Sequence, residues 1–267
     1  MTESMAVSTH DAGRWQRAAL RGLTMAWRCL RHPTWAVANV QNARDRRRDR
    51  RYPPLQRPAQ LHAIPEAVRI ITGANVADIE RVLADVPRPK LRRASALYGS
   101  PDGSRELVMV AYACCRLLRP RVVVETGVAN GFSTAAILQA LDENRQGRLI
   151  SIDLPHLHPR AEASIGAAVD PTRRDRWELR LGPAARLLKT VPVDGDGIDL
   201  FVQDAAHTVG GQLAEYRAAW PRLKPGGFLI TDDVTSAIEI FAREVGQQPL
   251  YVDQPKPSPI GILRHAT

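Results

Sequence analysis

The residues best suited to acid–base or metal chemistry each follow a short hydrophobic run in this 267-residue sequence. Apolar runs without alternation are typical of parallel strands that are covered on both faces. The carboxyl ends of such strands meet at one edge of the sheet, where ligands bind. The sequence therefore predicts one polar site assembled from distant segments. Its candidate residues are Glu125, Asp153, Asp204, His207, Asp232 and Asp233.

Three of these candidates are carboxylates that would repel one another at adjacent strand ends: Asp204, Asp232 and Asp233. A hard divalent cation such as Mg²⁺, which prefers oxygen ligands, would resolve that repulsion. The alternative is that some of them cap helices or pair with arginines. His207 lies three residues after Asp204 and has the intrinsic pKa of a general base near neutrality. Asp204 and His207 are therefore the candidate catalytic residues.

A glycine-containing loop after the first hydrophobic run predicts a site for a polar ligand. Gly127 and Gly131 allow a tight turn and a close backbone approach. Ser133 stands where a helix begins, and a helix start offers backbone N–H groups to a ligand. Asp153 lies twenty-two residues after Gly131, a position that suits a grip on ribose hydroxyls. Ala184 follows the third strand, where a small residue leaves room for a flat ring.

The alternation of strands and helices predicts an α/β fold with a doubly wound, mostly parallel sheet. A last pair of strands, Leu250–Val252 and Ile260–Leu263, predicts an antiparallel hairpin at the C-terminal end. The other expected strands are Val122–Glu125, Leu149–Asp153, Glu178–Leu181, Ile198–Gln203 and Phe228–Thr231. The expected helices of this part are Asn75–Leu83, Ser104–Leu118, Ser133–Leu141, Ala184–Val191, Gln212–Leu223 and Ser236–Val245.

The N-terminal part of the chain carries nearly all of the net charge of +9. Residues 1–60 hold twelve arginines and four acidic residues, whereas residues 61–267 are almost neutral at +1. We expect residues 1–60 to be a basic helical arm and linker, and residues 61–267 to be the main domain. Helical spacing predicts one arm helix over residues 12–31 and a second from Thr34 into the arginine block 44–51.

The role of the arm stays open at this stage. It could pack on its own domain or on a partner in a homodimer, lie on a membrane surface, or bind nucleic acid, since charge alone is blind to the partner. No apolar run approaches the ~20 residues that span a bilayer. The three cysteines give no disulfide framework. We therefore expect a cytoplasmic protein, with peripheral membrane contact through the arm as the alternative.

Two motifs give the sequence a family resemblance over about residues 98–262. The segment Glu125-Thr-Gly-Val-Ala-Asn-Gly-Phe-Ser133 is similar to a Glu-x-Gly-x-x-x-Gly-Tyr-Ser loop. The segment Leu223-Lys-Pro-Gly-Gly227 precedes a strand that ends in Asp232-Asp233. In this order they resemble class I S-adenosylmethionine-dependent methyltransferases, with a seven-stranded Rossmann-like sheet. More narrowly, they are similar to the cation-dependent O-methyltransferases of the catechol and caffeoyl-coenzyme A type and to their bacterial small-molecule and sugar-modifying relatives.

The resemblance implies a role for each candidate residue. S-adenosylmethionine would contact Gly127 and Gly131, with Ser133 near its carboxylate and Asp153 on its ribose. A divalent cation would bind the three aspartates and two neighbouring oxygens of a small-molecule or sugar acceptor. His207 stands where catechol-type members have a lysine base; bacterial sugar O-methyltransferases with a histidine base are the closer parallel. The full set implied for the cofactor is Glu125, Gly127, Gly131, Ser133, Asp153, Ala184 and Asp204.

Three other functions compete with O-methyl transfer. A nucleotide-dependent oxidoreductase would use the same sheet, but the loop lacks Gly-x-Gly-x-x-Gly. A nucleic-acid methyltransferase could use the basic arm, but Asp204-Ala-Ala stands where base-methylating enzymes have Asn/Asp-Pro-Pro-aromatic. A non-catalytic protein could keep the cofactor pocket and use the arm for a partner. We expect the acceptor side to be lined by the arm, by residues 58–100 and by the loop 254–259, none of which has a readable code.

Overall fold

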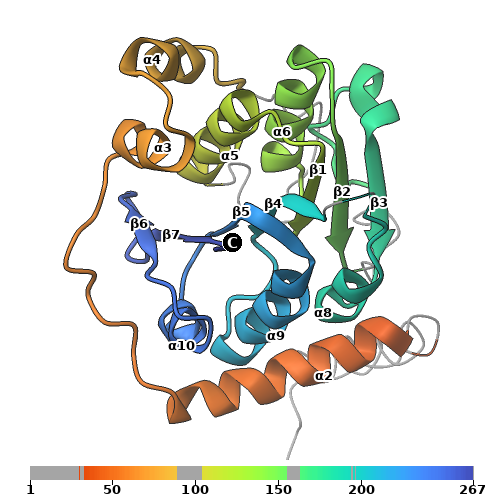
Figure 1. The fold of residues 1–267 in the computed structure, drawn as a ribbon. Coiled ribbons are helices and arrows are strands. Elements are labelled where there is room, and N and C mark those ends of the chain that lie inside the picture. Colours follow the sequence, from red (N-terminus) through yellow and green to blue (C-terminus); the bar gives the residue numbers. More distant parts are fainter. Residues whose placement is uncertain are drawn as a thin grey trace, which may run out of the picture.

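The computed structural model describes Leu30 and residues 33–88, 104–154, 163–193, 195 and 197–266. The strands of this part form one seven-stranded sheet in the order β3-β2-β1-β4-β5-β7-β6 (Figure 1). Strands β1 to β5 are parallel, whereas β7 is antiparallel to both of its neighbours. The predicted mostly parallel sheet with a C-terminal antiparallel hairpin is confirmed. The strands are β1 (Val122–Thr126), β2 (Arg148–Asp153), β3 (Trp177–Leu181), β4 (Ile198–Gln203), β5 (Leu223–Thr231), β6 (Leu250–Val252) and β7 (Ile260–Arg264).

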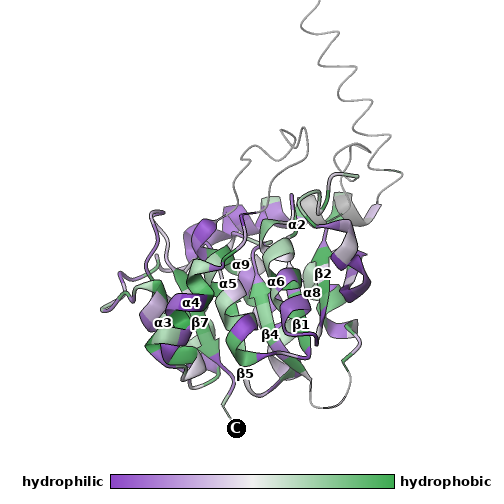
Figure 2. Ribbon diagram, turned by 90° about the horizontal axis from the view of Figure 1, so that it is seen from above, coloured by the Kyte–Doolittle hydropathy of each residue, from purple (hydrophilic) through white to green (hydrophobic). Residues whose placement is uncertain are grey.

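Hydrophobic side chains cover both faces of the sheet. All five residues of β1 are buried, and alternate positions point to opposite faces. Val123 packs into a core with α5 and α6, whereas Val122 and Val124 pack into a core with α9 and α10. Hydrophobic residues accordingly gather in the sheet between the helices (Figure 2). This burial explains why the strands read as unbroken apolar runs.

Helices flank the sheet on both sides (Figure 1). On one side α5 (Arg105–Leu118) packs against α6 (Phe132–Glu143) and against α3 (Ile64–Thr72), which contacts α4 (Val76–Ala84). On the other side α9 packs against α8 and α10. Those three helices are α8 (Ala184–Leu187), α9 (Val209–Ala219) and α10 (Ala237–Glu244). The described residues also form short 3₁₀ helices: η1 (Asp49–Arg51), η3 (Pro171–Arg176), η4 (Leu188–Thr190) and η5 (Trp220–Arg222).

Helix α2 (Pro33–Arg48) of the basic arm lies against α9 (Figure 1). Asp49, which follows α2, accepts a hydrogen bond from the first amide of α9, that of Val209, at 3.1 Å. Asn42 and Asp45 of α2 are partly buried, whereas Val37 and Val40 are 62% and 53% exposed. The described part of the arm is therefore packed on its own domain. The first expected arm helix, residues 12–31, lies outside the described residues apart from Leu30.

The largest differences from the predicted boundaries fall between α9 and β5. The helix expected to run to Leu223 ends at Ala219, because a 3₁₀ turn containing Pro221 follows it. Strand β5 begins at Leu223, five residues earlier than expected, and its register against β4 shifts between Ile198 and Leu200. The Pro-Gly-Gly segment, which we expected to precede the strand, therefore lies inside β5 at an irregularity of its register. No helix in the described ranges is long and apolar enough to cross a membrane.

Candidate active site

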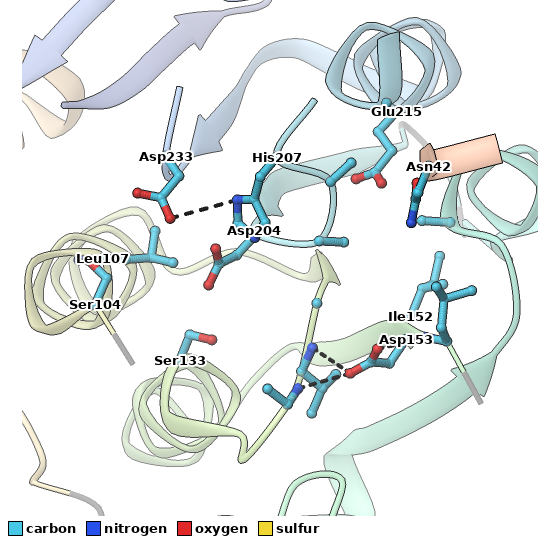
Figure 3. Close-up of a pocket in the computed structure, with 18 of the residues that line it drawn as sticks. Asn42, Ser104, Leu107, Ser133, Ile152, Asp153, Asp204, His207, Glu215 and Asp233 are labelled. Carbon is cyan, nitrogen blue, oxygen red and sulfur yellow. Dashed lines mark hydrogen bonds and ion pairs between the residues drawn. The ribbon is translucent and has the colours of Figure 1, made fainter. Parts of the chain in front are cut away.

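A cavity of about 900 Å³ opens at the carboxyl ends of the parallel strands (Figure 3). Each of the five parallel strands contributes a residue at or just beyond its end. They are Gly127, Asp153, Gly182, Asp204 and Asp233. The topology thus brings together segments that lie more than a hundred residues apart. This is the edge at which ligands bind in open α/β sheets.

The two loop glycines are needed for contacts within the protein. Gly127 has φ of 84°, and a Cβ there would lie 2.2 Å from the carbonyl oxygen of Asp204. Gly131 has φ of 82°, and a Cβ there would lie 2.7 Å from the Cα of Gly166. We expected these glycines to allow a close approach to a ligand; in the structure they allow a close approach to neighbouring backbone segments. Gly127 still lines the cavity, whereas Gly131 does not.

Asp153 holds the glycine loop in place at the end of β2. Its Oδ2 accepts hydrogen bonds from the amides of Val128 and Ala129, both at 2.9 Å (Figure 3). Ala129 has φ of 46°, a left-handed conformation that costs free energy for a residue with a Cβ. The carboxylate stabilises this strained turn and lines the cavity at the same time.

Glu125, expected to contact the cofactor, lies behind the loop and does not line the cavity. It is fully buried and accepts hydrogen bonds from Ser133 at 2.6 Å, Thr134 at 2.7 Å and Ser151 at 2.8 Å. Burial raises the pKa of Glu125, and these three hydroxyls oppose that rise. The residue therefore ties β1 to β2 and to the first turn of α6. Ser133 lines the cavity, but its hydroxyl hydrogen is directed to Glu125.

Glu215 of α9 lines the cavity from the side opposite the glycine loop (Figure 3). No motif in the sequence points to Glu215, because it lies inside a helix. Its Oε2 accepts a hydrogen bond from Thr126 at 2.8 Å, and its side chain is almost wholly buried. Burial raises the pKa of Glu215 to about 7.

The raised pKa of Glu215 predicts a pH-dependent contribution to stability. An unfolded glutamate titrates near ~4.3, so below that pH both states are protonated and the contribution is fully present. It is lost as pH rises through about 7, because the folded protein must then ionise a buried carboxyl. The native chain should lose this contribution between pH 4 and pH 8, and Glu215→Gln should not. The unfolding free energy of the variant minus that of the native chain should therefore rise by about 3 kcal/mol between the two pH values. Urea unfolding at both pH values measures this; parallel pH profiles would contradict it.

The acidic group predicted from the sequence comes together only in part. Asp204, His207 and Asp233 offer ligand atoms that all lie within 4.8 Å of one another, and all three line the cavity. His207 Nδ1 is 3.7 Å from Asp233 Oδ2 (Figure 3). Burial and the charge of Asp232 raise the pKa of Asp204. Asp232 itself is 1% exposed and does not line the cavity.

Lys256, from the loop between β6 and β7, takes the place that we expected a metal ion to fill beside Asp232. Its Nζ lies 2.9 Å from Asp232 Oδ2 and 3.3 Å from Asp233 Oδ1. The other oxygen of Asp232 accepts a hydrogen bond from Gln254 at 2.9 Å. Neither Lys256 nor Gln254 was singled out by the sequence, although we expected their loop to line the acceptor side.

Helix α2 lines the same cavity with polar side chains. Gln41, Asn42 and Asp45 face it from the arm, and Asn42 lies across from Glu215 (Figure 3). Ala184, at the start of α8, and Ala205, after Asp204, also line the cavity. This end suits a nucleoside, because it combines small residues with polar groups that read hydroxyl and amino groups. The opposite end holds His207, Asp233 and Lys256.

Residues 124–234 match a sequence family described as a methyltransferase domain. The matched segment, which is less than half of the chain, is similar to methyltransferase domains. TomG, an O-methyltransferase of Streptomyces achromogenes involved in tomaymycin synthesis and solved in complex with SAM, shares the fold with a TM-score of 0.52. It is 18% identical, and the match covers 72% of this chain and 96% of TomG. A comparison with curated proteins returns no match.

A methyltransferase of Geobacter sulfurreducens matches with a TM-score of 0.50 and 16% identity, over 72% of this chain and 98% of that one. At such identities the likeness shows the fold alone. The predicted class I methyltransferase fold is thereby confirmed. The matched residues include the glycine loop, Asp153, Asp204 and Asp233, whereas α2 and Lys256 lie outside them.

Proposed function

We propose that the chain is an S-adenosylmethionine-dependent O-methyltransferase that acts on a hydroxyl of a small molecule or sugar. One observation carries this proposal: a single cavity joins the nucleoside end beside Asp153 to a histidine–aspartate pair. A methyl donor and a proton acceptor could thus meet in one space. TomG, whose fold this domain shares, is an O-methyltransferase solved with SAM, and that supports the choice of donor.

The nucleoside end would hold the cofactor. Asp153 would accept hydrogen bonds from the ribose hydroxyls, and Gly127 and Ala184 would leave room for the backbone and the ring. The carboxylate of the methionine part would meet the first turn of α6. Amides of a first helical turn lack acceptors within the helix, and the helix dipole favours a negative charge there. This assigns the carboxylate to the amides, since the Ser133 hydroxyl already donates to Glu125.

The acceptor end would carry out the proton transfer. S-adenosylmethionine, when bound, supplies an electrophilic methyl group on a sulfonium. His207 would take the proton of the acceptor hydroxyl, the oxygen would form the new bond to the methyl carbon, and the carbon–sulfur bond electrons would return to sulfur. Asp233, beside Nδ1 of His207, would fix the ring and stabilise its charged form. Alignment of oxygen, carbon and sulfur would supply most of the rate enhancement.

The divalent cation implied by the resemblance fits the described residues only in part. Asp204, His207 and Asp233 could share an ion, but Asp232, one of the three aspartates expected to bind it, is bonded to Lys256 and Gln254. An ion held by His207 would also remove it as a base. We therefore assign no step to a metal. Metal assistance stays a prediction.

The arm would have a part in binding because α2 lines the nucleoside end. Its outer side carries exposed Val37 and Val40, followed by the arginines of the block 44–51. That surface is compatible with peripheral contact with an anionic membrane or with a second copy of the chain. Both contacts stay predictions; direct methylation of nucleic acid and hydride transfer remain the less favoured alternatives.

Transfer of a labelled methyl group tests the proposal. The full chain is incubated with methyl-labelled S-adenosylmethionine and a panel of diols, phenols and sugars, and products are read by mass spectrometry. We expect a mass gain of one methyl group on an oxygen of at least one acceptor. Binding of S-adenosylhomocysteine without transfer to any acceptor would favour the non-catalytic alternative. Label found only in DNA or RNA would favour the nucleic-acid alternative.

A further inference from the structure

The loop between β6 and β7 contacts the two aspartates, Asp232 and Asp233, that follow β5. Lys256 donates to Asp232 at 2.9 Å and to Asp233 at 3.3 Å. Ser258 donates to the same oxygen of Asp233 at 3.1 Å. Gln254 donates to the second oxygen of Asp232 at 2.9 Å and to the carbonyl of Ser258 at 2.7 Å. Both oxygens of the buried Asp232 are therefore bonded to this loop.

A second contact fixes the loop against the opposite side of the site. Ser104, the N-cap residue of α5, donates to the side-chain carbonyl of Gln254 at 3.1 Å. Gln254 is 8% exposed, so its amide is held between Ser104, Asp232 and the loop backbone. Lys256 follows two residues after Gln254, so this buried residue places Lys256 beside Asp232 and Asp233. Its position does not depend on a flexible surface contact.

The charges in this part of the site need a cation. Asp204, Asp232 and Asp233 raise one another's free energy when they are ionised, and Asp204 is partly buried. Lys256 is the positively charged side chain that the structure places against this group, and its Nζ bridges two of the three carboxylates. A divalent ion shared by all three aspartates would compete with Lys256 and Gln254 for the oxygens of Asp232.

We propose that Lys256 is the built-in cation of this carboxylate group, and that it and a divalent ion exclude one another. The inference rests on the proposed function only in placing the carboxylates at the acceptor end. An ammonium about 4 Å from a divalent ion repels it strongly at the low effective dielectric of a partly buried site. Lys256 is thus a positioning residue, which holds Asp232 and Asp233 in their conformations, Asp233 having a left-handed φ of 44°.

Manganese binding tests this proposal without recourse to activity. Titration of the full chain with Mn²⁺ alone, followed by the loss of the free-ion paramagnetic resonance signal, gives the affinity. We expect weak binding by the native chain. Lys256→Met, which removes the charge and keeps the length, should bind Mn²⁺ at least about tenfold more tightly. Lys256→Arg should stay weak because it keeps the charge.

Lys224→Met is the matched control, since Lys224 also pairs with an aspartate, Asp199, but lies outside the cavity. It should bind Mn²⁺ as the native chain does. Equal affinities of the native chain and Lys256→Met would overturn the proposal. So would micromolar binding by the native chain, a result that needs no variant to fold. A parallel titration with S-adenosylhomocysteine reports on the nucleoside end alone, so failure of the proposed function would be seen separately.

Discussion

Replacing His207 with alanine should lower the rate of methyl transfer by about two to four orders of magnitude, the range typical of a lost general base. The affinity for S-adenosylhomocysteine should stay within about twofold, because His207 is half exposed and lies at the acceptor end of the cavity. Rapid-quench turnover and calorimetry on the same preparation measure the two quantities. Added imidazole should restore part of the rate, because a small base can enter the space left by the ring.

The two measurements separate a base from a structural residue. A loss of rate together with a loss of cofactor affinity would mean that His207 supports the fold of the site. Turnover at the native rate would remove His207 from the mechanism and leave the proton to another group. His207→Gln, which keeps a hydrogen-bonding side chain but cannot take a proton at neutral pH, should be as slow as the alanine variant.

Replacing Asp153 with alanine should weaken the binding of S-adenosylhomocysteine by about tenfold to a hundredfold. The change removes hydrogen bonds from Val128 and Ala129 to a charged acceptor, each worth about 1.5–3 kcal/mol, and with them the support for a strained turn. It also removes the proposed partner of the ribose hydroxyls. Calorimetric titration measures the affinity, and thermal unfolding shows whether the variant remains folded.

Asp78→Ala is the control for Asp153→Ala. Asp78 also accepts hydrogen bonds, from the amide-bearing side chain of Asn75 and from Arg81, but it lies on α4 outside the cavity. Its replacement should leave the affinity unchanged. An Asp153→Ala variant that is folded and binds as tightly as the native chain would show that the cofactor lies elsewhere.

The strands and the glycine loop could be predicted because their causes are local. The apolar run before Glu125 needs cover on both faces, and Gly127 needs a left-handed φ that few other residues adopt. The acids at strand ends followed from the topology of a parallel sheet. What these residues do was less accessible, as Glu125 shows: three hydroxyls from α6 and β2 turn it into a buried anchor.

The sequence shows that Asp232 and Asp233 are adjacent, but it does not show which of them faces the cavity. Both residues lie just beyond β5, and the backbone turns at Asp233, which has a φ of 44°; Asp232 is buried, whereas Asp233 lines the cavity. The contact of Lys256 with Asp232 joins residues twenty-four positions apart through a loop without a motif. The lining of the nucleoside end by α2 likewise depends on how the arm packs on α9, which charge and periodicity do not specify.

The central claim is that the cavity beside Gly127 and Asp153 holds a sulfonium nucleoside for transfer of its methyl group. Calorimetric titration of the full chain with S-adenosylhomocysteine, and separately with NAD⁺, tests it most directly. We expect saturable one-to-one binding of S-adenosylhomocysteine, weakened in Asp153→Ala, and no saturable heat with NAD⁺. Binding of NAD⁺ with no heat from S-adenosylhomocysteine would contradict the account and favour an oxidoreductase.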